Sequence, residues 1–305
     1  MIDIVAIGEP MIEFNEQPDG RYLEGFGGDT SNAAIAAARL GARVRYVTQI
    51  GTDRFGDLLI NLWTREGVDT TFVRRHPSAA TGVYVVNHTK AGHAFTYLRA
   101  GSAASRMTPA DVPLAALVGA KFLHLSAISE AISASARETV ANVITLAKAA
   151  GAQVSYDTNL RLRLWSLEEA RPVIASTAAK ADILKTSIED ARQLTGLDTP
   201  EAVAAHYLAA GPGLVIVTLG ADGVLAATHQ KQERLAALKV TAVDATGAGD
   251  CFAGALLARL AAGDDPFAAA KYANAAAAFA TTGYGAVAHL PRPGDVESLL
   301  ARQAN

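Results

Sequence analysis

The segment Ala242–Leu260, AVDATGAGDCFAGALLARL, joins two glycines and an acid to the start of an apolar helical pattern. The first turn of a helix offers unpaired N–H groups and a partial positive charge to an anion. Gly247 and Gly249 let a phosphate come close to the backbone. Asp250 falls in the same turn, where the helix dipole favours its ionised form and keeps a proton acceptor beside the anion. This pattern predicts phosphoryl transfer to a hydroxyl group, and a Gly-rich turn without function is the alternative.

Two common nucleotide-binding designs are excluded by the positions of the glycines. No G-x-x-x-x-G-K-[ST] run occurs, so the chain is not a P-loop enzyme. The glycines come late in the chain, whereas a dinucleotide fingerprint follows the first strand. We expect an apolar strand ending at Val243 to lead into a helix that starts near Gly247.

Strand-like runs alternate with helical patterns along most of the chain. This alternation predicts an α/β fold in which a mostly parallel sheet is flanked by helices on both faces. The expected strands are 2–8, 43–51, 122–126, 153–159, 182–187 and 214–220. The expected helices are 30–40, 56–66, 134–150, 168–179 and 188–194.

Two segments, 11–29 and 77–100, break the alternation. In the second, TGVYVVNH and HAFTYLRA flank the turn-like TKAG without a helix between them, which is typical of a hairpin. We therefore expect one domain, 1–305, with a small β-sheet lid formed by about 11–29 and 77–104. An antiparallel extension at the edge of the main sheet is the alternative.

The composition favours small-molecule partners. Half of the 305 residues are hydrophobic, 19% are charged and the formal net charge is −3, with no run of Lys or Arg longer than a pair, so we expect no nucleic-acid partner. The single cysteine, Cys251, excludes an internal disulfide and a multi-cysteine metal site, and it favours a cytoplasmic location. We expect Cys251 to be a small buried residue. No apolar run reaches the ~20 residues of a membrane span, so no membrane segment is expected.

Several motifs resemble those of the ribokinase-like (PfkB) carbohydrate kinases. DATGAGD (244–250) resembles their C-terminal signature and GFGGDTSNAAIAAARLGA (25–42) resembles their N-terminal one. GTDRFG (51–56), VTLGADGVL (217–225) and ANAAAAFATTGYGA (273–286) extend the resemblance over essentially the whole chain. It implies a ribokinase-like fold with a β lid and ATP-dependent phosphorylation of a sugar. ATP brings Mg²⁺ with it, no protein metal ligands are expected, and activation by a monovalent cation such as K⁺ is left open.

The resemblance also implies roles for individual residues at the phosphate end. Asp250 is the base that accepts the proton of the sugar hydroxyl, and the N–H groups of Gly247, Ala248 and Gly249 form the anion hole. The resemblance assigns further nucleotide contacts to Asn159, Arg161, Ser187, Thr218, Gly220, Gly223 and Asn274. For Thr218 a turn between strands is the alternative, and for Asn274 a helix-packing role. Ser187 and Asp190 stand where the family commonly has Asn-x-x-Glu near magnesium, which puts that contact in doubt.

The substrate face resembles the 2-keto-3-deoxygluconate kinases within this family, on the motifs GFGGDTSN, TYLRAGSAAS and YDTNLRLRLW. Tyr97 and Arg99 are two positions apart on an expected lid strand and so face one side, and a guanidinium suits a sugar-acid carboxylate. A solvated strand charge or a lid-to-lid salt bridge is the alternative for Arg99, and strand packing is the alternative for Tyr84. The implied substrate contacts are Gly28, Asp29, Thr30, Ser31, Asn32, Tyr84, Tyr97, Arg99, Arg161 and Asp250.

Other readings remain open at this point. Fructokinase is the nearest alternative, because fructokinases share the D-x-N-x-R-x-x-L-W stretch, followed by ribokinase and a sugar-binding regulator without catalysis. The gluconate and galactonate epimers of the acid are not distinguished. Because lids of this family often pair between subunits, we also expect a homo-oligomer formed through the lid.

Overall fold

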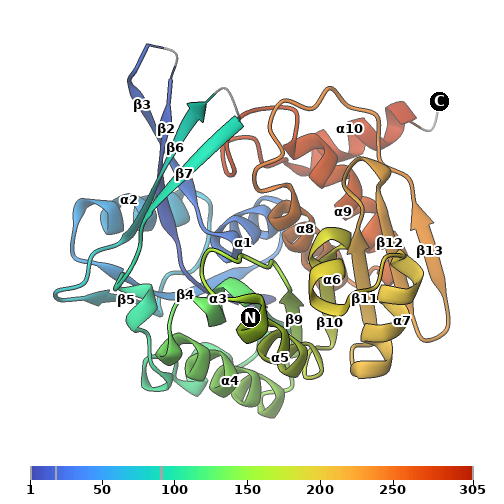
Figure 1. The fold of residues 1–305 in the computed structure, drawn as a ribbon, viewed down its shortest axis with the longest axis horizontal. Coiled ribbons are helices and arrows are strands. Elements are labelled where there is room, and N and C mark those ends of the chain that lie inside the picture. Colours follow the sequence, from blue (N-terminus) through green and yellow to red (C-terminus); the bar gives the residue numbers. More distant parts are fainter. Residues whose placement is uncertain (1, 18, 90–91, 304–305) are drawn as a thin grey trace.

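The computed structural model describes residues 2–17, 19–89 and 92–303, which form two sheets (Figure 1). In spatial order the nine-stranded main sheet comprises β13 (Gln232–Leu235), β12 (Val224–Thr228), β11 (Leu214–Thr218), β10 (Ile183–Ser187), β9 (Gln153–Asp157), β8 (Phe122–Ser126), β1 (Ile4–Ile7), β4 (Val44–Gly51) and β5 (Val73–His76). The seven strands from β11 to β5 run parallel to one another, whereas β12 and β13 extend the other edge of the sheet in antiparallel pairing.

Helices cover both faces of this sheet. The helices are α1 (Asp29–Arg39), α2 (Arg54–Arg65), α3 (Ala127–Ala131), α4 (Ala134–Ala149), α5 (Leu167–Ala178), α6 (Ile188–Thr195), α7 (Pro200–Ala210), α8 (Ala248–Ala262), α9 (Pro266–Ala280) and α10 (Pro293–Gln303). Alternate residues of β1 pack into the cores on opposite faces of the sheet. Ile4 and Ala6 pack with α1, α8 and α9, while Val5 and Ile7 pack with α4, α5 and α7. The predicted α/β class, with its parallel sheet between two helical layers, is confirmed.

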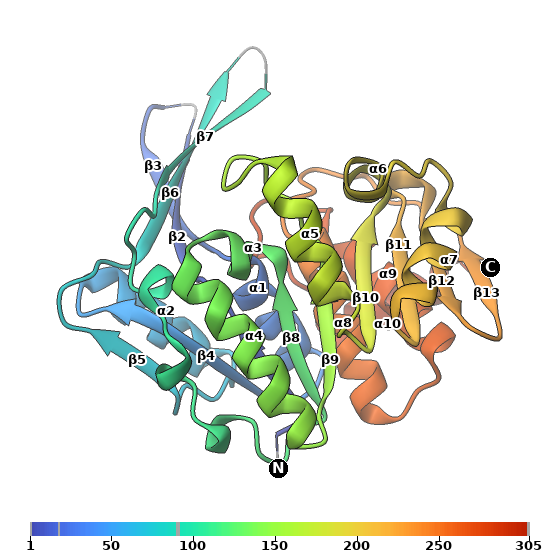
Figure 2. The same ribbon diagram turned by 60° about the horizontal axis from the view of Figure 1, so that its bottom comes forward.

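The lid strands form a second sheet that rises from one end of the main body (Figure 2). Its order is β3 (Tyr22–Gly27), β2 (Met11–Glu16), β6 (Gly82–Thr89) and β7 (Gly92–Leu98). The β2–β3 and β6–β7 pairs are antiparallel, and β2 joins β6 in parallel. The two interrupting segments therefore build a sheet of their own, and the edge-extension alternative is wrong. Part of the expected turn at 89–92 lies outside the described residues.

Other parts of the main body differ from the sequence predictions. Helix α7 and the edge strands β5, β12 and β13 were not anticipated, and 236–247 is irregular where a strand ending at Val243 was expected. The irregular segment is held by hydrogen bonds to Asp244. Its carboxylate accepts from the N–H groups of Thr246 and Gly285, both at 2.9 Å. The Val243 N–H donates to the Thr281 carbonyl at 2.7 Å. These bonds replace a sheet ladder with a compact loop. Within the described ranges, no helix is both long and apolar enough to cross a bilayer.

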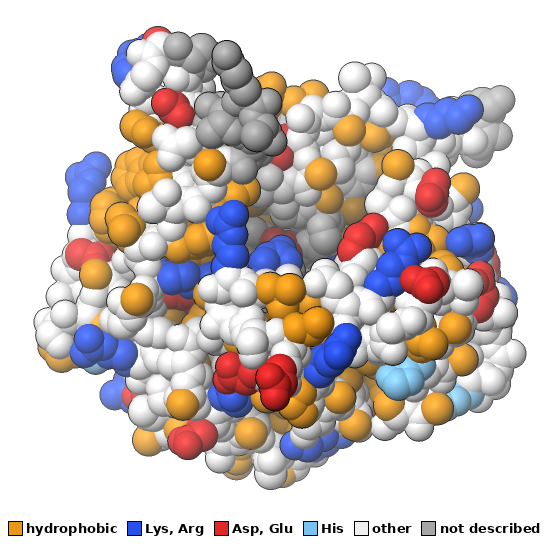
Figure 3. Space-filling view, viewed as in Figure 1, with side chains coloured by type: hydrophobic (Ala, Val, Ile, Leu, Met, Phe, Trp, Pro, Cys, Tyr) orange, Lys and Arg blue, Asp and Glu red, His pale blue; other side chains and the backbone are white. Residues whose placement is uncertain are grey.

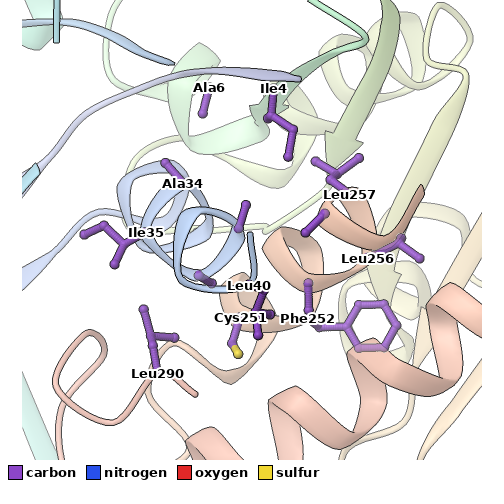
Figure 4. Close-up of a cluster of buried hydrophobic side chains, with 14 of the residues drawn as sticks. Ile4, Ala6, Ala34, Ile35, Leu40, Cys251, Phe252, Leu256, Leu257 and Leu290 are labelled. Atoms are coloured by element: carbon purple, nitrogen blue, oxygen red, sulfur yellow. The ribbon is translucent and has the colours of Figure 1, made fainter. Parts of the chain in front are cut away.

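The close packing of α1 against α8 fixes the position of the N-terminal end of α8, which carries Asp250. Figure 4 shows Ala34 and Ile35 of α1 beside Cys251, Phe252, Leu256 and Leu257 of α8. Gly254 lies at the contact, where a Cβ would meet the Ala33 carbonyl oxygen and stand 2.9 Å from the Cβ of Ala36. A residue without a side chain is therefore needed for the two helices to approach this closely.

Candidate active site

A cavity of about 1070 Å³ lies between the lid and the carboxyl ends of the central strands. Figure 3 shows the surface hollowed at this place, with basic and acidic side chains around the hollow. Such a cleft outside the carboxyl ends of parallel strands is the usual ligand site of an open α/β sheet. The predicted residues that line it are Gly28, Asp29, Asn32, Tyr84, Tyr97, Arg99, Asn159, Arg161, Gly247, Gly249 and Asp250. Thr30, Ser31, Ser187, Thr218, Gly220, Gly223, Ala248 and Asn274 are not among its lining residues.

The N-terminus of α8 opens into the cavity and has the shape of an anion cradle. Gly247 is the N-cap and adopts a φ of 76°, in the left-handed region. A Cβ there would stand 2.9 Å from the carbonyl oxygen of Ala286, so a side chain would strain this turn. At Gly249 a Cβ would lie 3.3 Å from Lys185 Nζ and would occupy the space in front of the helix start. The helix dipole and the missing side chains suit a phosphate group, although the N–H of Ala248 donates to the Ala245 carbonyl at 3.2 Å in this structure.

Asp250 is the third residue of α8 and lies at the cavity wall. Its carboxylate accepts a 2.8 Å hydrogen bond from Asn32 Nδ2. Burial, followed by the charges of Asp29 and Asp157, raises the pKa of Asp250 to about 7, while the Asn32 hydrogen bond and Lys185 act in the opposite direction. Burial thus acts against the ionised form that the helix dipole was expected to favour. A carboxylate with a pKa near neutrality is better matched to proton transfer than an ordinary one.

Asp29 and Asn159 connect α1 to the loop after β9 across the cavity floor. Asn159 Nδ2 donates to Asp29 Oδ2 at 2.8 Å, and the other Asp29 oxygen accepts from the Thr30 N–H at 2.8 Å. Asn159 has a φ of 23°, the one positive φ of a non-glycine residue among the described residues. Such backbone strain is found mostly where a site over-determines the conformation.

Two residues of the N-terminal motif have side chains that point away from the cavity. Thr30 Oγ1 lies 2.9 Å from the Tyr46 hydroxyl, and Ser31 Oγ accepts from Trp63 Nε1 at 2.9 Å. Both side chains are buried in the core under α1. These hydroxyls therefore satisfy buried polar groups of the core in this structure, and a substrate contact of Thr30 or Ser31 stays a prediction.

The expectation that Cys251 is a small buried residue is confirmed. Its side chain is fully buried among α1 and α8 residues (Figure 4), and burial raises the pKa of its thiol. A buried thiol of this kind is a small apolar filler rather than a nucleophile.

The lid contributes an aromatic wall and one buried ion pair. Tyr84 pairs with Tyr97 across β6 and β7, and the Tyr84 hydroxyl donates to Glu13 Oε2 at 2.5 Å. Arg99 forms an ion pair with Glu9, whose side chain is fully buried and also accepts from Ser102 Oγ at 2.5 Å. Arg99 is thus in a salt bridge in this structure, but its partner precedes β2 and lies outside the expected lid, so the pair differs from the lid-to-lid bridge given as an alternative. The sequence analysis did not identify Glu9 as its partner, because residues 90 positions apart carry no pairing signal.

The loop that carries Arg161 is held by Asp190. The Leu160 N–H donates to Asp190 Oδ2 at 3.0 Å, and Arg161 Nη1 donates to the Leu160 carbonyl at 3.0 Å. Ser187 caps α6 by accepting from the Asp190 N–H at 3.0 Å. In the described part of the chain, no group of three or more His, Cys, Asp or Glu side chains is arranged to hold a metal ion. Asp190 and Ser187 here organise a loop and a helix start.

The predicted nucleotide loop forms the turn between β11 and β12. The Leu219 N–H donates to the Gly223 carbonyl at 2.8 Å, and Thr218 Oγ1 donates weakly to the Thr186 carbonyl at 3.4 Å. Asn274 Nδ2 donates to the Ala236 carbonyl at 2.8 Å and so ties α9 to the loop before α8. Both structural alternatives therefore hold, and nucleotide contacts of these residues stay a prediction.

Lys185 is a cavity residue that the sequence analysis missed. Its ammonium forms a 2.7 Å ion pair with Asp157, and only 8% of the residue is exposed. A lysine inside the apolar strand ILKTS was the available signal, because lysine is rarely buried without a partner.

Comparisons with known proteins agree with this geometry. The pfkB family carbohydrate kinase profile matches residues 1–293. A 2-dehydro-3-deoxygluconokinase of Thermoproteus tenax is 34% identical over 98% of this chain and 94% of its own length, and probable fructokinase-4 of Arabidopsis thaliana is 34% identical over 97% and 96%. A crystal structure of a putative ribokinase II from E. coli, in complex with ATP and Mg²⁺, superimposes with a TM-score of 0.91 at 28% identity, covering 99% of this chain and 100% of that one. This protein therefore belongs to the pfkB family of carbohydrate kinases.

Proposed function

We propose that this chain is a sugar-acid kinase that transfers the γ-phosphate of ATP to the terminal hydroxyl of 2-keto-3-deoxygluconate, giving 2-keto-3-deoxy-6-phosphogluconate. One observation carries the proposal: a single cavity joins Asp250 and the start of α8 to Tyr97, Arg99 and Arg161. Asp250 and the helix start suit the site of phosphate transfer. The tyrosine and the two arginines suit a polyhydroxy acid with a carboxylate.

In this proposal Asp250 accepts the proton of the sugar hydroxyl. A carboxylate cannot deprotonate an alcohol in advance, but in a loose phosphoryl-transfer transition state the proton moves late and a weak base suffices. The N–H groups at Gly247, Ala248 and Gly249 meet the developing negative charge, at about 3–4 kcal/mol per well-placed donor. Asn32 holds the Asp250 carboxylate in place at 2.8 Å.

ATP and Mg²⁺ are the proposed co-substrate and metal, supported by the E. coli ribokinase II complex that contains both. The turn at Gly247 and Gly249 fits a phosphate, because a Cβ at Gly247 would strain the turn against Ala286 and a Cβ at Gly249 would crowd the Lys185 ammonium. Mg²⁺ supplies charge neutralisation when bound with the nucleotide. Activation by K⁺ and nucleotide contacts of Asn159, Ser187, Thr218 and Asn274 remain part of the proposal.

The lid supports the proposed homo-oligomer. Leu23 of β3 and Leu98 of β7 are 62% and 64% exposed on the two edge strands of the lid, and in this proposal a second copy of the chain covers them. Size-exclusion chromatography with light scattering on the wild type and on Leu23→Ser/Leu98→Ser tests this: a dimer that dissociates in the double variant supports it, and a wild-type monomer rejects it. The cytoplasmic location rests on cysteine usage alone.

Fructokinase is the second candidate, and Glu9 is the observation that favours it. Because Glu9 already pairs with Arg99, the positive charge of Arg99 is neutralised before any substrate binds. A neutral ketose then needs no further charge, whereas a sugar acid must share Arg99 or use Arg161.

A substrate panel separates the two candidates. ATP-dependent phosphorylation is measured on 2-keto-3-deoxygluconate, its galactonate epimer, fructose and ribose, with the wild type, Arg99→Ala and the exposed lid control Arg21→Ala. We expect the keto-deoxy acids to have the highest kcat/KM, and Arg99→Ala to raise their KM far more than that of a neutral sugar. Preference for fructose or ribose would leave a carbohydrate kinase and reject the sugar-acid assignment.

A further inference from the structure

Lys185 and Asp157 form a buried ion pair in the floor of the cavity. They occupy paired positions on the adjacent parallel strands β10 and β9, and their side chains are 10% and 6% exposed. Nζ and Oδ2 are 2.7 Å apart. Because replacing a buried ion pair by apolar residues is often neutral or stabilising, the pair gives the fold little that Leu or Val would not. A role in the site is the better explanation.

The ammonium of Lys185 lies beside the first turn of α8, which carries Asp250. A Cβ on Gly249, the residue before Asp250, would stand 3.3 Å from Lys185 Nζ. Among residues 2–17, 19–89 and 92–303, Asp157 is the one hydrogen-bond partner of this ammonium, which donates three bonds when fully satisfied. Lys185, Asp157 and Asp250 line the same cavity.

The charged and titratable groups around Asp250 come from five elements. Acidic groups dominate, and Lys185 is the cation that favours the ionised form of Asp250. These groups are Asp29 of α1, Asp157 of β9, Lys185 of β10, Tyr84 of β6 and Cys251 of α8, with Arg161 of the loop after β9 on the same cavity wall.

We propose that Lys185 is a positioning residue whose buried charge, moderated by Asp157, sets the protonation of Asp250. The proposal rests on the role of Asp250 as the base. Removing the ammonium leaves Asp250 facing two carboxylates, so its ionised form becomes less favourable. Removing the charge of Asp157 instead relieves one repulsion and leaves the ammonium to Asp250 alone. The two neutralising substitutions therefore act in opposite directions on the same group.

The test compares Lys185→Met, Asp157→Asn, the double variant and the exposed-lysine control Lys148→Met. The pH dependence of kcat/KM is recorded on whichever panel sugar the wild type phosphorylates. We expect the acidic limb to move up by about 0.5–1 pH unit in Lys185→Met, down in Asp157→Asn, and to return close to the wild-type position in the double variant. Lys148→Met leaves it unchanged.

A second measurement does not depend on turnover. The 13Cγ signal of Asp250, assigned by its loss in Asp250→Asn, is titrated in each variant, so the charge of Asp250 is followed even where a variant is inactive. The double variant carries no unpaired buried charge and covers the case in which Lys185→Met does not fold. Shifts of opposite sign in the single variants support the proposal. Equal or absent shifts of the Asp250 signal overturn it, whereas failure of the proposed function would show as a wild type that prefers another sugar.

Discussion

The amide of Asn32 donates a 2.8 Å hydrogen bond to the carboxylate of Asp250, which lies 218 positions later in the chain. The two residues meet because α1 and α8 pack closely at Gly254. The N-terminal motif thus holds the carboxylate of the C-terminal motif that we propose as the base. Four predictions follow from this junction and its surroundings.

Asp250→Asn is expected to lower kcat at least ~10²-fold with little change in the substrate KM, because the amide keeps the shape and the Asn32 contact but accepts no proton. Steady-state kinetics at saturating ATP measures both constants. A variant with nearly normal kcat would remove Asp250 from the base role.

The kcat/KM of the wild type is expected to rise with pH up to about pH 7 and to level off above it. Burial and the charges of Asp29 and Asp157 raise the pKa of Asp250 to about 7, and the base acts only when ionised. A pH–rate profile from pH 5 to 9 checks this. Asn32→Leu should move the rise to higher pH, because it removes a hydrogen bond that favours the ionised form. An acidic limb near pH 4 would contradict the raised pKa.

Asp250→Asn is also expected to stabilise the protein at pH 8. A carboxyl whose pKa is raised on folding destabilises the native state above its unfolded pKa near ~4, increasingly up to its folded pKa. Because Asp250 is partly exposed to the cavity, we expect a gain of roughly 1–2 kcal/mol at pH 8 that disappears toward pH 4. Urea unfolding at both pH values measures it, and an equal gain at both would point to a cause other than ionisation.

Gly254→Ala is expected to lower the free energy of unfolding by roughly 1–3 kcal/mol, because the new methyl group pushes α1 away from α8. Its Cβ would stand 2.9 Å from Ala36 Cβ and from Ala37 N. The control is Gly294→Ala in α10, where a Cβ has no heavy atom within 4 Å. Denaturant unfolding compares the two, and equal stabilities would show that the helix contact can relax.

Much of the fold was predictable because it depends on local pattern. The strand 122–126 and the helix starting at Ala134 follow from the alternation of a short apolar run with a helical pattern. The strand expected to end at Val243 was wrong. The Asp244 carboxylate accepts hydrogen bonds from the N–H groups of Thr246 and Gly285, which hold this segment as a loop. The edge strands β12 and β13 are short and carried no such periodicity.

The sequence by itself determined the family motifs, the alternation of strands and helices, and the position of Asp250 at a Gly-rich helix start. Only the tertiary structure decided which charges meet: Glu9 with Arg99, Asp157 with Lys185, and Asn32 with Asp250. Each of these pairs joins separate elements, and spacing along the chain does not encode contacts between them. The upward shift in the pKa of Asp250 had to come from the fold, because its causes are burial and the carboxylates of Asp29 and Asp157, which belong to other elements.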